Sequence, residues 1–208
     1  MKSLGVAKTG NTYFTSDMHF GHVNILTHAK RPFADVEEMN EALVENYNSV
    51  VKPADTVYIL GDHALGTVKE SLEYTRRLNG TKVLIAGNHD KCWKGHKKYE
   101  KFIPDYEDVG LTVLQGPLPF DLFGRTVQIC HFPQQVDWRH VDKDAKDLAY
   151  KPDRFADYRP SRSPVVHGHV HQMWKARGTD LNVGVDVWDY KPVPAETVKD
   201  YLDMMTTR

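Results

Sequence analysis

Residues 82–90 read KVLIAGNHD, an apolar run that passes directly into a polar turn. A short aliphatic run of this kind is typical of a strand buried on both faces, as in a parallel sheet. The turn places the amide of Asn88, the imidazole of His89 and the carboxylate of Asp90 just beyond the strand. Open α/β sheets bind ligands at the carboxyl ends of their strands. This stretch therefore predicts an α/β fold with its chemistry at that edge.

Two earlier stretches repeat this design. Residues 12–16, TYFTS, end at Asp17, and residues 56–60, TVYIL, end at Gly61 and Asp62. Apolar residues recur at helical spacing in the intervals between the runs, over 35–50 and 67–78. The first half of the chain therefore predicts the order β-α-β-α-β, with parallel strands.

Capping signals mark the start of both predicted helices. Asp35 is followed three residues later by Glu38, and Thr67 is followed in the same way by Glu70. This is the spacing of a capping box, in which each side chain accepts a hydrogen bond from a backbone N–H of the first turn. We therefore expect both helices to be capped by these side chains.

The second half of the chain changes character, with short strands separated by turn residues. Strands are expected at 112–114, 118–122, 126–130, 164–167 and 180–187, with a hairpin tip at 123–125. A final helix is expected to begin at Pro194 and to run to Met205. Residues 1–208 are expected to form one domain, with a long polar connection over 132–163 that lies over the site.

The composition is that of an ordinary globular protein. Lys+Arg 27 nearly balances Asp+Glu 28, so no overall field draws the chain to nucleic acid or a membrane, although a local basic patch stays open. The two cysteines, Cys92 and Cys130, form no CxxC pair, which favours a reducing compartment. The N-terminus lacks an apolar signal segment, and no run of about 18 apolar residues occurs. We therefore expect a cytoplasmic protein that does not cross a membrane.

Potential metal ligands follow several of the predicted strands. The seven are Asp17, His19, Asp62, Asn88, His131, His169 and His171. Asp17 and His19 are two residues apart, which on an extended segment turns both side chains to one side, and His169 and His171 repeat that spacing. Mixed carboxylate, amide and imidazole ligands suit Mn, Fe, Co, Ni or Zn, and the Asp62 carboxylate can bridge two ions. The set predicts two adjacent divalent metal ions, an arrangement used to attack phosphate esters.

The ordered motifs DMH at 17–19, GD at 61–62, GNHD at 87–90, His131 and GHVH at 168–171 resemble those of the calcineurin-like metallophosphoesterase superfamily. The resemblance implies an α/β sandwich of two mixed β-sheets packed face to face and flanked by helices. It assigns one metal ion to Asp17, His19, Asp62 and His171, and the other to Asp62, Asn88, His131 and His169. It also implies that Asp62 bridges the ions and that His89 acts as general acid or phosphate ligand, with Mn²⁺ as the expected metal.

A closer resemblance involves TSDMHFGHVNI at 15–25, RPF at 31–33 and NVGVD at 182–186. These stretches are similar to a small bacterial and phage subgroup of phosphoesterases whose natural substrates are poorly defined. Substrate contacts are expected from His22, Asn24, Arg31 and Arg139, since arginine forms paired hydrogen bonds with phosphate.

The predicted function is hydrolysis of a phosphodiester or phosphomonoester in a small nucleotide-type substrate, including cyclic nucleotides. A nuclease would be expected to carry a basic, aromatic-rich groove, which the balanced charge does not favour. A protein phosphatase is a further alternative. A scaffold without catalysis would be expected to have lost ligands or His89, and none of these is missing.

Overall fold

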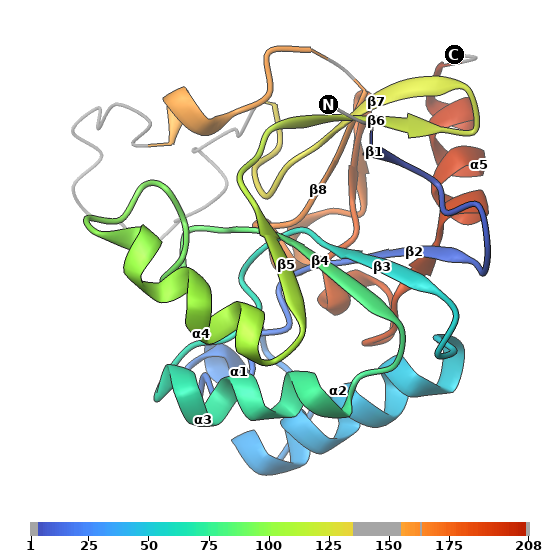
Figure 1. The fold of residues 1–208 in the computed structure, drawn as a ribbon. Coiled ribbons are helices and arrows are strands. Elements are labelled where there is room, and N and C mark those ends of the chain that lie inside the picture. Colours follow the sequence, from blue (N-terminus) through green and yellow to red (C-terminus); the bar gives the residue numbers. More distant parts are fainter. Residues whose placement is uncertain (1–3, 135–154, 163, 207–208) are drawn as a thin grey trace, which may run out of the picture.

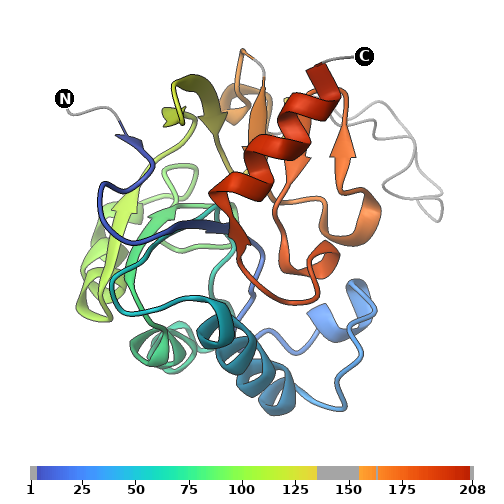
Figure 2. The ribbon, with the colours of Figure 1, turned by 90° about the vertical axis from the view of Figure 1, so that its right-hand side faces the viewer.

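The computed structural model describes residues 4–134, 155–162 and 164–206, and shows two β-sheets packed face to face with helices outside them (Figures 1 and 2). The strands are β1 (Leu4–Gly5), β2 (Thr12–Thr15), β3 (Thr56–Ile59), β4 (Thr81–Ile85), β5 (Leu111–Leu114), β6 (Leu118–Leu122), β7 (Arg125–Ile129), β8 (Val165–His167), β9 (Ala176–Arg177), β10 (Asp180–Asn182) and β11 (Val193–Pro194). The α-helices are α1 (Ile25–His28), α2 (Val36–Val50), α3 (Val68–Glu73), α4 (Ile103–Asp108) and α5 (Ala195–Thr206). Short 3₁₀ turns are η1 (Tyr74–Arg77), η2 (Tyr99–Phe102), η4 (Ala156–Tyr158), η5 (His171–Met173) and η6 (Val185–Val187).

Both sheets are mixed. One has the order β11-β2-β3-β4-β5, in which β2 to β5 are parallel and β11 is antiparallel to β2. The other has the order β1-β6-β7-β8-β10-β9, with an antiparallel β6–β7 hairpin and parallel β7–β8 and β8–β10 pairs. The predicted α/β fold with two face-to-face sheets is thus confirmed.

The alternation of side chains along each strand fills two separate cores. In β3, Val57 and Ile59 face the helices α2 to α4, while Tyr58 faces the second sheet. Between the sheets, Phe14 and Tyr58 meet Phe120 edge to face, with ring centroids 5.2 and 4.9 Å apart. Helix α5 closes the outer side of the second core through buried Val198 and Leu202 (Figure 2). Both faces of the parallel strands are therefore covered, as their apolar runs predict.

The helix caps agree with the sequence in one case and differ in the other. Asp35 Oδ1 accepts a hydrogen bond from the backbone N–H of Glu38 at 2.8 Å, as predicted, and the Glu38 carboxylate turns back to Ala34 N. Thr67 precedes α3 but makes no capping hydrogen bond with its side chain, so the second prediction was wrong. Helix α3 is correspondingly short and continues as the 3₁₀ turn η1.

Several element boundaries in the second half also differ from the prediction. The strand expected over 180–187 ends at Asn182, whose side-chain amide donates to the backbone carbonyls of His171 and Trp174. The chain beyond Asn182 then turns toward β2, where Ser16 and Gly184 form an isolated bridge. The final helix begins at Ala195, one residue later than expected. Among the described residues, every helix is too short or too polar to cross a bilayer.

Candidate metal centre

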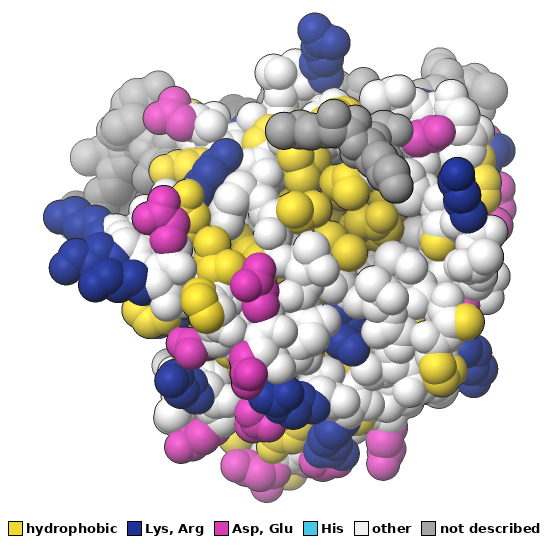
Figure 3. Space-filling model, viewed as in Figure 1, with side chains coloured by type: hydrophobic (Ala, Val, Ile, Leu, Met, Phe, Trp, Pro, Cys, Tyr) yellow, Lys and Arg dark blue, Asp and Glu magenta, His cyan; other side chains and the backbone are white. Residues whose placement is uncertain are grey.

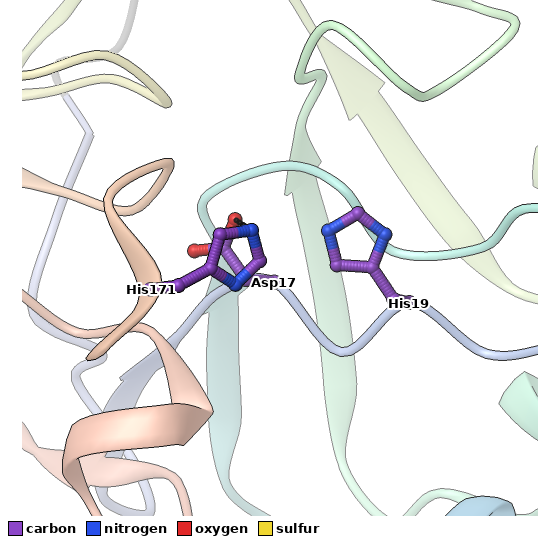
Figure 4. A group of neighbouring side chains, drawn as sticks. All are labelled: Asp17, His19 and His171. Atoms are coloured by element: carbon purple, nitrogen blue, oxygen red, sulfur yellow. Dashed lines mark ion pairs between the residues drawn. The ribbon is translucent and has the colours of Figure 1, made fainter. Parts of the chain in front are cut away.

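Six of the seven predicted ligands form two clusters at one edge of the sandwich, where β2, β3, β4, β7 and β8 end. The first cluster comprises Asp17, His19 and His171, and the second comprises Asp62, His131 and His169. Within each cluster the potential ligand atoms lie within 4.8 Å of one another. In Figure 4, Asp17 and His19 come from the segment after β2, and His171 approaches from the segment after β8. Residues from both sheets thus build the site.

One carboxylate oxygen of Asp62 faces both clusters. Asp62 Oδ2 lies 3.6 Å from His19 Nε2 and 3.2 Å from His131 Nε2. The other oxygen, Oδ1, accepts a hydrogen bond from the backbone N–H of His89 at 2.8 Å. This contact fixes the carboxylate so that Oδ2 points between the clusters, which is the position a bridging ligand needs.

The seventh predicted ligand, Asn88, lies at the second cluster. Its Oδ1 is 3.1 Å from His131 Nε2, and His169 Nδ1 is 3.2 Å from the same nitrogen. The other nitrogen of His131, Nδ1, lies 2.8 Å from the backbone carbonyl of Leu60 and donates to it. Nε2 then presents a lone pair beside three other potential ligands. Imidazole nitrogens, a carboxylate and an amide oxygen gathered in this way fit a divalent cation.

The chemistry of the buried atoms also fits a cation at the first cluster. Among the described residues, His19 Nε2 is buried without a hydrogen-bond partner. Buried polar atoms of this kind are rare in folded proteins and call for an explanation. A metal ion coordinated by His19, Asp17 and His171 would satisfy this atom.

Burial and the neighbouring carboxylates shift the pKa values of the cluster imidazoles in opposite directions, raising those of His131 and His171 and lowering those of His19 and His169. Burial lowers the pKa of His19 and of His169 well below the ordinary imidazole value. Burial alone would raise the pKa of Asp62, but His131 outweighs it and holds this pKa well below its usual range. Burial also acts to lower the pKa of His131, yet the Asp62 carboxylate prevails and raises it to about 9. Asp62 is thus ionised beside the neutral imidazoles of His19 and His169, and a metal ion at the second cluster would displace the proton that Asp62 stabilises on His131.

The backbone at the site is strained. Asp17, His19, Asp62, His169 and His171 have φ of 57°, 54°, 53°, 72° and 47°, a left-handed conformation that costs free energy in residues with a side chain. The extended spacing assumed for the two pairs 17/19 and 169/171 was therefore wrong. Such strain persists only where surrounding contacts hold the chain, and it gathers at functional sites.

Glycines allow the close approach of these segments. A Cβ on Gly168 would lie 2.3 Å from Asp17 Oδ2 and 1.9 Å from Ser16 Oγ. A Cβ on Gly87 would lie 2.5 Å from Asp62 Oδ1. Both glycines therefore leave room for a ligand carboxylate that any larger residue would displace.

His89 and His22 line the rim of the first cluster. His89 is exposed, and its ring lies edge to face with that of His19, at 5.4 Å between centroids. His22 is half-buried, with Nδ1 3.3 Å from His19 Nδ1, and burial followed by the charge of His89 lowers its pKa to about 4. His89 is thus accessible to a substrate phosphate, and His22 supports a predicted ligand directly.

The other predicted substrate residues are placed differently. Asn24 is exposed at the start of α1, and its side chain makes no capping hydrogen bond there. Arg139 lies outside the described residues. Arg31 is buried, and its guanidinium donates to Asp186, to the backbone oxygens of Asp17 and Met18, and to the Met39 sulfur. With all its donors directed into the protein, Arg31 does not face a substrate, and we correct that prediction.

The sequence analysis included neither Asp186 nor Asp90 among the predicted site residues. Asp186 Oδ2 lies 2.8 Å from His171 Nδ1. Asp90 is fully buried and accepts hydrogen bonds from the backbone N–H groups of Asp62, His63 and Gly87. The available signal for Asp186 was the NVGVD motif at 182–186, one of the stretches that carry the closer resemblance.

Part of the long polar connection reaches the second cluster. Phe155 is buried and stacks on Phe132 at 4.7 Å between ring centroids, and its ring also lies 5.3 Å from that of His169. Arg159 Nη1 donates to the Pro133 carbonyl at 2.8 Å, which ties the two described ends of the connection together. These ends therefore pack beside the second cluster, while residues 135–154 lie outside the described part.

Residues 10–173 match the family of calcineurin-like phosphoesterases. The chain belongs to this family. An uncharacterized protein of Methanocaldococcus jannaschii is 49% identical over 196 residues, covering 89% of this chain and 88% of that protein. The gene 66 protein of Mycobacterium phage L5 is 31% identical, covering 86% of this chain and 87% of its own length. The phage relative agrees with the predicted subgroup, and the family makes this chain a phosphoric ester hydrolase.

The fold also occurs in a solved structure. A protein of unknown function from Aquifex aeolicus superposes with a TM-score of 0.63 and 26% sequence identity, covering 92% of this chain and 99% of that one. The near-complete coverage of both chains shows that the two-sheet sandwich of this phosphoesterase is present there with few additions.

Proposed function

We propose that this phosphoesterase uses two divalent ions to hydrolyse a phosphodiester or phosphomonoester of a small nucleotide-type substrate, including cyclic nucleotides. The observation that carries the proposal is Asp62 Oδ2, which faces His19 at 3.6 Å and His131 at 3.2 Å. One carboxylate oxygen between two ligand clusters matches the requirement of a bridge between adjacent ions. Mn²⁺ and a cytoplasmic location are parts of the proposal.

The residues have distinct roles in this proposal. The first ion would be held by Asp17, His19, Asp62 and His171, and the second by Asp62, Asn88, His131 and His169. Bound divalent ions lower the pKa of water and neutralise charge that develops on phosphate. In this proposal His89, which is exposed beside His19, gives a proton to the leaving oxygen or holds the phosphate.

The test begins with protein stripped of metal and titrated with Mn²⁺ in a calorimeter, followed by assays with bis(p-nitrophenyl) phosphate. We expect two ions per chain and turnover that requires them. A single ion per chain, or equal turnover in a chelator, would contradict the proposal. A panel of nucleotides, cyclic nucleotides and phosphoproteins, assayed with Mn²⁺, then separates the small-substrate proposal from the protein phosphatase alternative.

A local basic segment favours a second candidate, cleavage of nucleic acid strands. The segment KCWKGHKKYEK, residues 91–101, holds five lysines and one glutamate although the whole chain has a net charge of -1. Figure 3 shows Lys and Arg side chains gathered at the left edge, where Figure 1 has the segment that leads into α4. The segment is tied to the site, because His96 Nε2 lies 2.9 Å from the backbone oxygen of Asn88.

The lysine segment gives this candidate its own test. Phosphates on either side of a cleaved bond would attract Lys97 and Lys98, which are exposed and take part in no ion pair among the described residues. We would compare Lys97→Glu/Lys98→Glu with the unsubstituted chain on a labelled single-stranded oligonucleotide and on bis(p-nitrophenyl) phosphate. A KM that rises only on the oligonucleotide supports nuclease activity, and the absence of oligonucleotide cleavage removes this candidate.

A further inference from the structure

Arg31 and Asp186 form a buried ion pair that touches both sides of the first cluster. We propose that they are positioning residues, which set the geometry of the first metal site before any ion binds. This inference rests on the proposed function, in which Asp17, His19 and His171 hold a metal ion. It assigns to Arg31 and Asp186 a role in metal affinity at one of the two sites rather than in substrate contact.

Asp186 orients the imidazole of His171. Its Oδ2 lies 2.8 Å from His171 Nδ1, so that ring nitrogen donates to the carboxylate. The opposite nitrogen, Nε2, then carries the lone pair and faces Asp17 Oδ1 at 4.0 Å. A carboxylate partner of this kind fixes the tautomer of a ligand histidine and makes its free nitrogen a stronger ligand.

Arg31 connects this carboxylate to the strained turn that carries Asp17. Its Nε donates to Asp186 Oδ1 at 2.8 Å and its Nη2 donates to Asp186 Oδ2 at 3.2 Å. Nη2 also donates to the backbone oxygen of Asp17 at 2.6 Å, and Nη1 to that of Met18 at 2.9 Å. One planar group therefore fixes the segment after β2 and, through Asp186, the imidazole that approaches from the segment after β8.

The burial of the pair argues for this role rather than for stability alone. The side chains of Arg31 and Asp186 are 0% and 1% exposed. A buried ion pair contributes little net stability, because removing both charges from water offsets their attraction. The left-handed backbone at Asp17 and His19, with φ of 57° and 54°, needs contacts that hold it. Hydrogen bonds from Arg31 to the carbonyls of Asp17 and Met18 supply such contacts.

A matched control exists on the surface. Arg77 and Glu41 form a similar two-bond pair, with Nη1–Oε1 at 2.7 Å and Nη2–Oε2 at 2.6 Å. Their side chains are 47% and 50% exposed, and they touch neither cluster in the described structure. Substitutions Arg77→Lys and Glu41→Gln therefore make the same chemical changes as Arg31→Lys and Asp186→Asn, away from the site.

The experiment measures binding of Mn²⁺ to stripped protein by calorimetry and the absorption spectrum of the Co²⁺ form. For Asp186→Asn and Arg31→Lys we expect one of the two sites to weaken by about 10- to 100-fold, with the other changed by less than about threefold. The Co²⁺ spectrum should change with the weakened site. Arg77→Lys and Glu41→Gln should leave both affinities and the spectrum unchanged.

Two results would overturn the inference. If Asp186→Asn binds Mn²⁺ at both sites with unaltered affinity, the Asp186 carboxylate does not set the geometry of the first cluster. If the Mn²⁺ affinity falls equally at both sites, the Arg31–Asp186 pair stabilises the whole edge of the sandwich rather than the first cluster in particular. Near-UV circular dichroism of the metal-free variants identifies misfolding. If Arg31→Lys misfolds, the inference is tested with Asp186→Asn alone, because this substitution keeps the shape of the side chain. If the unsubstituted chain binds fewer than two ions, the proposed function fails first.

Discussion

The two ligand clusters lie side by side but are supported by different chemistry. In the first cluster, His171 donates to the charged carboxylate of Asp186, which Arg31 holds in turn. In the second, His131 donates to the neutral backbone carbonyl of Leu60, and the rings of Phe132 and Phe155 surround His169. Support by charge and support by packing respond to different substitutions, so we expect that the two clusters can be weakened separately.

The largest effect is expected where the two clusters share a residue. Asp62→Ala removes the carboxylate that faces both His19 and His131, so both sites should fail together and metal-dependent turnover should be lost. Loss of bound metal should also remove the stabilisation that Mn²⁺ gives the folded state, which lowers the unfolding temperature in Mn²⁺. Turnover and thermal unfolding with and without Mn²⁺ check this, and near-normal turnover at saturating metal would show that Asp62 is no bridge.

His89→Ala should separate chemistry from metal binding. The side chain is exposed and lies outside both clusters, so both ions should be retained. As a general acid, His89 matters most for a poor leaving group, and turnover on an alkyl or ribose ester should fall by roughly 10²–10⁴-fold. The loss on a nitrophenyl ester should be smaller. Similar losses on both esters would instead identify His89 as a phosphate ligand, and loss of an ion would place it in a metal site.

Phe155→Ala should weaken the second cluster without affecting the first. Removing a buried aromatic ring costs about 3–5 kcal/mol of the free energy of unfolding, and here it also frees the ring of His169 to move. Denaturant unfolding measures the first effect and Mn²⁺ calorimetry the second. Phe123→Ala is a suitable control, because Phe123 lies on the hairpin tip with 44% of its surface exposed. If the Mn²⁺ affinity of Phe155→Ala falls equally at both ion sites, the aromatic packing stabilises the whole ligand-bearing edge of the sandwich.

Gly168→Ala should give the smallest of these effects and should act on the first cluster. The added methyl would lie 2.3 Å from Asp17 Oδ2, so the carboxylate must move. Overpacking of this kind costs about 1–3 kcal/mol of stability. Unfolding and Mn²⁺ binding should both change, and binding should weaken at one site only. If Gly168→Ala binds Mn²⁺ at both sites with unchanged affinity, displacement of the Asp17 carboxylate does not impair metal binding.

Strands β2, β3 and β4 were predictable because their signal is local. Apolar runs over 12–16, 56–60 and 82–86 correspond to β2, β3 and β4 within one residue at each end, since burial on both faces leaves no polar position in a strand. The cap at Thr67 was not predictable in the same way, because its geometry depends on how the preceding loop enters the helix. The strand expected over 180–187 ended early because Asn182 bonds to two carbonyls of the segment 171–174, a contact invisible in the sequence.

The sequence by itself identified the seven candidate ligands and placed them after strand ends, because residue type and strand pattern can both be recognised within short segments. The family resemblance also implied their division into two sets, but only the tertiary structure shows the backbone conformation that produces it. His169 and His171 are two residues apart, yet left-handed turns send them to different clusters, where β2, β3, β7 and β8 meet. The structure likewise turned Arg31 from a predicted substrate contact into the partner of Asp186, 155 residues away in the chain. Contacts over that separation depend on the packing of the two sheets, and packing is a property of the whole fold.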